Sequence, residues 1–327
     1  MTNRIITADA KDGLKQIESK SIDCCVTSPP YYGLRDYGIE GQIGLEESPD
    51  IYIEKLVEVF REVRRVLADD GTLWVVIGDS FAGGKGGRGD FDRMYTRPDG
   101  SSDRFTQKHN GVRIVREKGE CKPKDLFGIP WMLAFALRND GWFLRSDIIW
   151  HKPNAMPESV KDRPTRAHEY VFLFSKSKNY YYDHAAITER ATSTSIKKFT
   201  DNGKDKQHGH GRRHSGFNGR YAAKLEVGGI PITKNRRSVW NVATKPYPEA
   251  HFATFPPELV RPCILAGCKP DGTVLDPFFG AGTTGLVALE EGRSFIGIEI
   301  NPVYVEIAEK RLGIARGGAD EKNHIFH

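Results

Sequence analysis

The stretch Thr273–Pro302, TVLDPFFGAGTTGLVALEEGRSFIGIEINP, decides the fold. A short apolar run ends at Asp276, a glycine-rich turn spans Gly280–Gly285, an apolar helical run follows, and a second β-rich run ends at Glu299. Strand–loop–helix–strand units of this kind bind nucleotides, because glycines let the backbone approach a ligand and an acid after the second strand can accept both ribose hydroxyls. We therefore expect a nucleotide-like cofactor at this loop.

The residues before the glycines indicate which cofactor this is. Gly280–Gly285 fits the pattern G-x-G-x-x-G, which alone is a weak sign of a nicotinamide-dependent oxidoreductase. In that class the strand runs straight into the glycines, whereas here Asp276-Pro277-Phe278-Phe279 intervenes. A carboxylate at this place suits a ligand with an ammonium and a sulfonium and would repel a pyrophosphate. The pattern favours S-adenosylmethionine; the alternative is that Asp276 only caps the turn and Glu299 is a solvated strand end.

A second segment, Thr27-Ser28-Pro29-Pro30-Tyr31, follows an apolar run and suggests the reaction. Two consecutive prolines remove backbone donors and stiffen the turn. The Ser28 hydroxyl and the Pro29 carbonyl can then accept hydrogen bonds from an amino group, while Tyr31 offers a ring for stacking a base. An exocyclic aromatic amine is a poor nucleophile because its lone pair is delocalised, and such acceptors localise that pair for in-line attack on a methyl carbon. Alone the segment could be a simple loop, but with the glycine loop it predicts methyl transfer to an amino nitrogen.

The rest of the chain predicts an α/β domain around these two segments. Its β-rich runs are mostly continuous rather than alternating, as in a largely parallel sheet that is covered on both faces. Seven strands are expected, at Arg4–Ala8, Ile22–Ser28, Thr72–Gly78, Asp147–His151, Tyr170–Ser175, Thr273–Asp276 and Phe295–Ile300. Helices are expected at Pro49–Leu67, Pro130–Arg138, Pro257–Ala266, after the glycine loop and at Pro302–Leu312.

Composition divides this domain into parts. We expect catalytic-domain segments at 1–81, 126–189 and 239–327, a flexible insertion rich in glycine and charge at 82–125, and a basic recognition region at 190–238. Residues 190–237 hold twelve Lys/Arg and three acids, an excess larger than the net charge of +5 of the whole chain. Such a region suits phosphate contacts, although it could also be an ordinary solvated loop. The cations predicted to contact DNA are Lys197, Lys198, Arg212, Arg213, Arg236 and Arg237.

Other features argue against competing classes. The five cysteines form no C-x-x-C pair, which predicts neither a disulfide framework nor a zinc site. Pro262-Cys263 mimics the nucleophile of cytosine-C5 methyltransferases, but its helical surroundings favour a buried side chain. The histidines of His208–His214 are interleaved with arginines and glycines, so no metal site is expected. No run approaches the ~18–20 apolar residues that span a bilayer, and the N-terminus lacks a signal pattern, so we expect a cytoplasmic protein.

Together these motifs resemble those of the amino-methylating DNA methyltransferases of the circularly permuted β class, over nearly the whole chain. Asp276–Gly282 is similar to the cofactor motif of that family, Thr27–Tyr31 to its catalytic motif, and 251–256 to a motif that closes over the methionine end. Segments 150–154 and 168–170 resemble those beside the target-base pocket. The resemblance implies cofactor contacts from Asp9, Ala10, Thr254, Phe255, Asp276, Phe278, Gly280, Gly282, Thr283 and Glu299, and catalytic roles for Ser28, Pro29, Pro30 and Tyr31.

This resemblance implies a Rossmann-like, seven-stranded, mostly parallel sheet with an inserted recognition region, and a site-specific DNA methyltransferase that uses S-adenosylmethionine. Serine at position 28 is more typical of enzymes that make N4-methylcytosine, and an adenine-N6 enzyme is the alternative. A DNA-binding protein that keeps an inactive methyltransferase fold is a further rival. Double-stranded DNA is the expected partner, with a homodimer and a cognate restriction endonuclease as further partners, in a bacterial or phage-encoded enzyme associated with the nucleoid.

Overall fold

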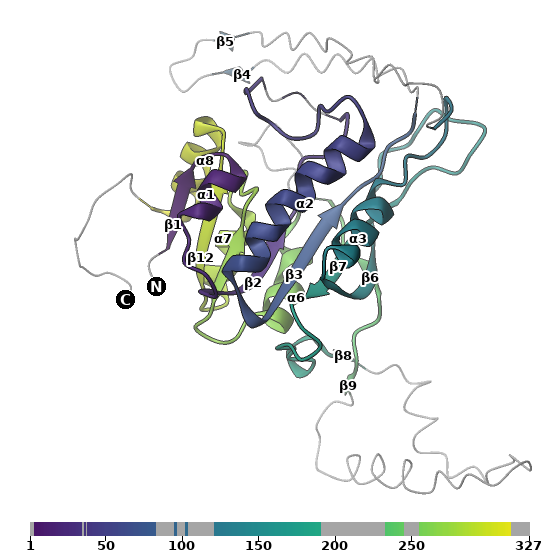
Figure 1. Cartoon of the computed structure of the whole chain (residues 1–327). Coiled ribbons are helices and arrows are strands. Elements are labelled where there is room, and N and C mark those ends of the chain that lie inside the picture. The colour runs from purple at the N-terminus through teal and green to yellow at the C-terminus, as the bar shows by residue number, and fades with distance from the viewer. Residues whose placement is uncertain are drawn as a thin grey trace, which may run out of the picture. The chain divides into compact units, whose positions relative to one another are not determined.

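The computed structural model describes the chain in eight stretches (Figure 1). These are residues 3–34, 36, 38–82, 95–96, 102–103, 121–190, 233–244 and 255–314. The chain divides into a larger unit, Met1–Tyr182 with Ser238–His327, and a smaller unit, Asp183–Arg237. Each unit is considered by itself.

The larger unit is built on an eight-stranded sheet with the order β1-β12-β11-β2-β3-β7-β6-β10. Its strands are β1 (Arg4–Thr7), β2 (Ile22–Thr27), β3 (Leu67–Ile77), β6 (Phe143–His151), β7 (His168–Ser175), β10 (Val239–Asn241), β11 (Thr273–Asp276) and β12 (Ser294–Glu299). All seven expected strands are present. The expected number of seven was too low, because β10 pairs with β6 at one edge and its three residues are too few to show a pattern.

The sheet is parallel except for β7, which runs antiparallel to both β3 and β6. The adjacent pairs β1–β12, β12–β11, β11–β2 and β2–β3 are all parallel. Because parallel neighbours end at the same edge, the residues that follow β1, β12, β11 and β2 meet there. The expectation of a mostly parallel sheet is confirmed, and it brings the two sequence motifs together.

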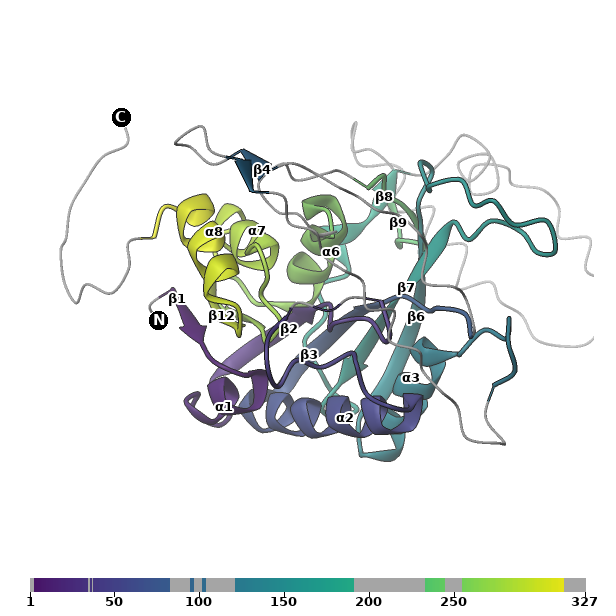
Figure 2. The same cartoon turned by 90° about the horizontal axis from the view of Figure 1, so that it is seen from above.

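Helices cover both faces of the sheet (Figure 2). On one face lie α1 (Ala10–Lys15), α2 (Pro49–Val66) and α3 (Ile129–Asn139); on the other lie α6 (Pro257–Gly267), α7 (Thr283–Glu290) and α8 (Pro302–Leu312). The five expected helices are present, and α1 was not foreseen. It has only six residues, and its N-terminus depends on the Asp9 side chain, which accepts hydrogen bonds from two backbone N–H groups.

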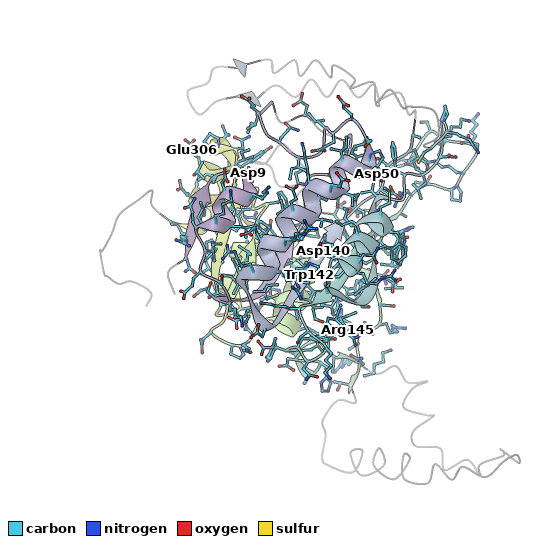
Figure 3. The ribbon with its side chains drawn as sticks, in the orientation of Figure 1. Asp9, Asp50, Asp140, Trp142, Arg145 and Glu306 are labelled. Carbon is cyan, nitrogen blue, oxygen red and sulfur yellow. The ribbon has the colours of Figure 1, made fainter. Side chains whose placement is uncertain are left out.

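Helix α2 shows how local sequence sets the elements. The Ser48 side chain accepts a hydrogen bond from the Ile51 N–H, Pro49 occupies the first turn, and a buried stripe follows at helical spacing. The Arg61 guanidinium joins α2 to Asp140 at the end of α3 at 2.6 Å. Asp140 is labelled in Figure 3. The helix ends at Val66 and β3 begins at Leu67, five residues before the expected start at Thr72. Residues 69–71 have the composition of a turn, but in the structure they are extended and belong to the strand.

Among the described residues, four short strands lie outside the main sheet. In the larger unit β4 (Tyr95–Thr96) pairs with β5 (Ser102–Asp103), in the stretch expected to be an insertion. The smaller unit holds a 3-10 turn η1 (Ala185–Ile187) and an antiparallel pair, β8 (Glu189–Arg190) with β9 (Thr233–Lys234). Among the residues that the structure describes, none of the helices has both the length and the apolar character to cross a membrane.

Candidate active site

A cavity in the larger unit opens at the edge where β1, β12, β11 and β2 end. Among the residues proposed from the sequence, those that line it are Asp9, Ala10, Ser28, Pro30, Phe255, Phe278, Gly280, Thr283 and Glu299. Pro29, Tyr31, Asp276 and Gly282 are not part of its lining, and Thr254 lies outside the described residues. The structure therefore brings the glycine loop and the catalytic segment to one cavity, with Asp9 beside them at the start of α1 (Figure 3).

The glycine loop is held open toward this cavity. Gly282 adopts a left-handed conformation, with φ of 78°, at the N-cap of α7, which only glycine adopts at little cost. Gly280 also has a positive φ, of 51°, and a Cβ built on it would meet no atom within 4 Å. The loop thus offers bare backbone and free space to a ligand.

Glu299 ties this loop to the end of β12. Its carboxylate accepts hydrogen bonds from the Gly280 N–H and the Asn301 N–H, both at 2.8 Å. Burial raises the pKa of Glu299 above its usual value, and the two backbone N–H bonds oppose that rise. Each carboxylate oxygen keeps a further lone pair, so the group can still accept hydrogen bonds from ligand hydroxyls.

Asp276 is buried next to the cavity. Its carboxylate is 1% exposed and accepts hydrogen bonds from the Thr27 hydroxyl at 2.6 Å, the Thr284 hydroxyl at 2.7 Å and the Phe278 N–H at 3.0 Å. These bonds join the end of β2, the glycine loop and the start of α7. Asp276 thus lies behind the cavity wall and fixes the catalytic segment to the cofactor loop; a direct contact with the cofactor stays a prediction.

Burial raises the pKa of Asp276 to about 6, against 3.8 for a free carboxyl, and its hydrogen bonds limit this rise. A carboxyl whose pKa is raised in the folded state takes up protons on folding between the two values. Its contribution to stability is therefore present below about pH 4 and is lost as the pH rises through about 6.

We expect Asp276→Asn to remove this pH dependence. Relative to the parent, the unfolding free energy of the variant should rise by up to about 3 kcal/mol between pH 4 and pH 7. This follows because the pKa of Asp276 is about 6 in the folded protein and 3.8 in a free carboxyl. The amide can donate to Thr284, whose hydroxyl also reaches the Val26 carbonyl. Urea unfolding at a series of pH values measures the difference. The exposed control Asp12→Asn, next to Lys15, should show no such rise, and a flat difference for Asp276→Asn would contradict the prediction.

The catalytic segment is fixed by two tyrosines. Tyr52 on α2 donates a hydrogen bond to the Pro30 carbonyl at 2.7 Å, and Tyr31 donates one to Glu169 at 2.7 Å. Pro29 is buried, whereas Ser28 is partly exposed and lines the cavity. Tyr52 already binds the Pro30 carbonyl, and the use of the Pro29 carbonyl and the Ser28 hydroxyl as acceptors of the amine stays a prediction.

The loop that follows this segment contributes a part of the wall that the sequence did not indicate. The Gly33 N–H donates to the Gly44 carbonyl at 2.7 Å and closes the loop, which carries Ile39, Gln42 and Ile43 to the cavity. Asn301 and Tyr304, at the start of α8, also line it. No motif marks these residues; the glycines of the loop are a sequence signal that could have predicted a turn there.

The cavity also has a distinct charge. Its charged lining groups are Asp9 and Glu299, and none of the described residues that line it is Lys or Arg. The remaining lining is largely apolar, with Ile298, Phe278 and Phe255 among it. Such a wall suits a ligand that carries positive charge next to a flat apolar ring, and it lacks the cations that a pyrophosphate would need.

The remaining predictions concern Cys263, the histidines of 208–214 and the predicted DNA contacts. Cys263 is fully buried in α6 with its thiol against the Leu259 carbonyl, so the expectation of a packing role is confirmed. The histidines of 208–214 lie outside the described residues. Within the described ranges no cluster of three or more His, Cys, Asp or Glu side chains could hold a metal. Of the six predicted DNA contacts, Lys197, Lys198, Arg212 and Arg213 lie outside the described residues, and Arg236 and Arg237 belong to the smaller unit.

Comparisons with known proteins give matches over most of the chain. A family model for N6 and N4 methyltransferases, described as DNA methylase, matches residues 22–310. The chain is 49% identical over 312 residues to the Type II methyltransferase M.Cfr9I of Citrobacter freundii. The aligned region covers 94% of this chain and 87% of M.Cfr9I. It is 47% identical over 309 residues to the Type II methyltransferase M.SmaI of Serratia marcescens, with 94% and 90% covered.

Solved structures show the same fold. The PvuII DNA methyltransferase, described as cytosine-N4-specific, aligns with a TM-score of 0.61 and 18% identity over 98% of this chain and 89% of that one. The DNA modification methylase TTHA0409 from Thermus thermophilus, complexed with S-adenosyl-L-methionine, aligns with a TM-score of 0.54 and 21% identity over 95% and 93%.

Proposed function

The chain belongs to the DNA methylase family of N6 and N4 amino-methyltransferases, and from this premise we propose that it methylates the exocyclic N4 of cytosine in DNA, using S-adenosylmethionine. The expected methyltransferase fold is confirmed by the solved structures. Adenine N6 is the alternative target within the same family. The choice of cytosine rests on Ser28 in the catalytic segment.

The observation that carries the proposal is the charge and composition of the cavity. It has two carboxylates, Asp9 and Glu299, an apolar wall, and the Ser28 hydroxyl in the same lining, without a Lys or Arg among the described lining residues. S-adenosylmethionine supplies a methyl group on a positively charged sulfonium, and its adenine and ribose match the apolar wall and the Glu299 acceptor. Glu299 would hold the ribose and the Gly280 loop would approach the methionine part, while Asp276 would organise both from behind the wall.

For the amine, the proposed acceptors are the Ser28 hydroxyl and the Pro29 carbonyl. Their positions at a rigid double-proline turn cost no reorganisation during the reaction. The Tyr31 ring would stack the target base, with its hydroxyl anchored on Glu169. The Pro30 carbonyl, bound by Tyr52, would stabilise the turn and not the base.

DNA binding is proposed for the basic region 190–238. The two ends of this region meet in the ladder of β8 and β9, and Arg237 is 72% exposed with Glu189 at 3.2 Å. The cations between these ends have the composition for phosphate contacts, which would offset part of the cost of extracting a base from the duplex, a few kcal/mol. Affinity for DNA should then fall steeply with salt concentration, measured by fluorescence anisotropy; a flat dependence would argue against this role.

Further partners are proposed from the family alone. A cognate restriction endonuclease and a second copy of the chain would be the partners, in the cytoplasm of a bacterium or of a phage-infected cell, with the protein on the nucleoid. Calibrated ultracentrifugation of the full chain tests the second copy.

One experiment tests the proposed activity. The full chain is incubated with methyl-labelled S-adenosylmethionine and duplex DNA, and the DNA is digested to nucleosides that are separated by chromatography. We expect N4-methylcytosine. N6-methyladenine as the sole product would overturn the choice of base, and saturable binding of NAD but not of S-adenosylhomocysteine would overturn the cofactor.

A further inference from the structure

A continuous chain of polar side chains leads from the cavity to Glu169. The Ser28 hydroxyl lines the cavity and interacts with the Tyr31 hydroxyl, and the Tyr31 hydroxyl donates a hydrogen bond to Glu169 Oε2 at 2.7 Å. The other oxygen of Glu169 accepts a hydrogen bond from the Lys152 ammonium. Four side chains from three parts of the sequence are thus connected in series.

The members of this chain are held in place by packing. A Cβ on Gly78, at the end of β3, would lie 2.6 Å from the Tyr31 ring and 3.3 Å from the Glu169 carboxyl carbon, so both side chains fill the space that this glycine leaves. The Lys152 ammonium lies 4.3 Å from the centre of the Trp150 ring. Glu169 and Lys152 keep 18% and 19% of their side chains exposed, so the far end of the chain reaches solvent.

We propose that Ser28, Tyr31 and Glu169 form the path by which the proton leaves the amino group during methyl transfer; this rests on the proposed function. The amine nitrogen bonds to the methyl carbon as the carbon–sulfur bond breaks, and the electron pair of that bond stays on sulfur. The nitrogen then carries one proton too many. That proton passes to Ser28 Oγ as the Ser28 proton passes to Tyr31 Oη and the Tyr31 proton passes to Glu169 Oε2, which ends as a carboxylic acid and later releases the proton to water.

The chemistry favours this direction. A carboxylate is a stronger base than an aromatic exocyclic amine, so the transfer to Glu169 runs downhill. Burial and the neighbouring carboxylate raise the pKa of Tyr31 well above its ordinary value, and the tyrosine therefore relays a proton without a lasting phenolate. Glu169 acts through Tyr31 and not on the base, which makes it a positioning and accepting residue at the end of the path.

Other carboxylates near the site are engaged elsewhere. Asp276 is bound by two threonine hydroxyls and lies behind the wall, and Glu299 binds two backbone N–H groups. Asp79 accepts from the backbone N–H groups of Ser80, Gly128 and Ile129, at the start of α3. Among the described residues Glu169 is the carboxylate that the Tyr31 hydroxyl reaches.

The titratable and charged groups around Glu169 come from three elements. They are Tyr31 after β2, Lys152 and His151 at the end of β6, and Arg166 and His168 before and on β7. Burial and the nearby Arg166 lower the pKa of His168 below its usual value. Because His168 is a titratable neighbour of Glu169, its contribution has to be separated from that of Glu169.

The test compares Glu169→Gln, Tyr31→Phe and their double variant with the parent in single-turnover methylation of duplex DNA. Each single variant should lose about 100-fold in rate, the size of a general acid–base contribution, and the double variant should lose little more because either change interrupts the same path. The pH–rate profile of the parent should be altered in Glu169→Gln and preserved in the control His168→Gln.

Two further measurements separate this role from a structural one. Calorimetric binding of S-adenosylhomocysteine, and base extraction reported by 2-aminopurine fluorescence in the DNA, should be unchanged in Glu169→Gln. A rate within about two-fold of the parent, a pH–rate profile that is unchanged in Glu169→Gln, or losses that multiply in the double variant would overturn the proton path while leaving the methyltransferase intact. A parent protein that transfers no methyl group to DNA would instead overturn the proposed function, and the path with it.

Discussion

Replacing Gly297 with valine is expected to cost more than about 3 kcal/mol of unfolding free energy and to abolish binding of the cofactor. Gly297 lies in β12, and even a Cβ at this position would come within 2.4–2.6 Å of three atoms of the Phe279 ring. Phe279 cannot give way easily, because it stacks on Phe295 with a centroid distance of 5.4 Å and also fills the space beside Gly285. Since Phe279 immediately precedes the glycine loop, any movement of its ring displaces the loop.

Urea unfolding and calorimetry with S-adenosylhomocysteine measure the two effects of Gly297→Val. The matched control is the double variant Gly297→Val/Phe279→Leu, in which a smaller side chain accepts the added methyl groups and should restore a part of both stability and binding. A single variant that unfolds and binds like the parent would show that the glycine is not required for the packing of Phe279.

The fold could be predicted to the extent that it depends on patterns within short segments. Continuous apolar runs identified the buried parallel strands, and helical spacing with a serine cap identified α2. The patterns failed where an element depends on distant partners. β10 exists because Val239–Asn241 pairs with β6, some ninety residues away, and the extended start of β3 at Leu67 pairs with Ile22.

The site was predictable in its motifs but not in the directions of its side chains. The sequence placed Asp276 beside the cofactor by its charge, whereas the fold directs it toward Thr27, 249 positions away, and Thr284. The bond between Tyr31 and Glu169 spans 138 positions and could not be read from either segment. Contacts between loops at the edge of a sheet follow from strand order, which the sequence pattern alone leaves open.

Replacing Ser28 with alanine is expected to lower the rate of methyl transfer about 1,000-fold, in the range seen when a preorganised polar group is removed from an active site. The change removes the hydroxyl proposed to accept from the amine, together with its interaction with Tyr31, while the turn keeps both prolines and the Tyr52 contact. Binding of S-adenosylhomocysteine should therefore stay near the value of the parent. Single-turnover transfer of labelled methyl groups to duplex DNA measures the loss, with calorimetry for the ligand.

The control for Ser28→Ala is Ser21→Ala, because the exposed Ser21 hydroxyl bonds only locally to the Glu18 carbonyl, just before β2. This variant should retain the full rate. The comparison also separates an enzyme from a protein that keeps an inactive methyltransferase fold, since in the latter Ser28→Ala would leave methylation at the same background as the parent. Equal rates in parent and Ser28→Ala, well above that background, would instead place the acceptor for the amine on another group, of which the Pro29 carbonyl is the nearest along the chain.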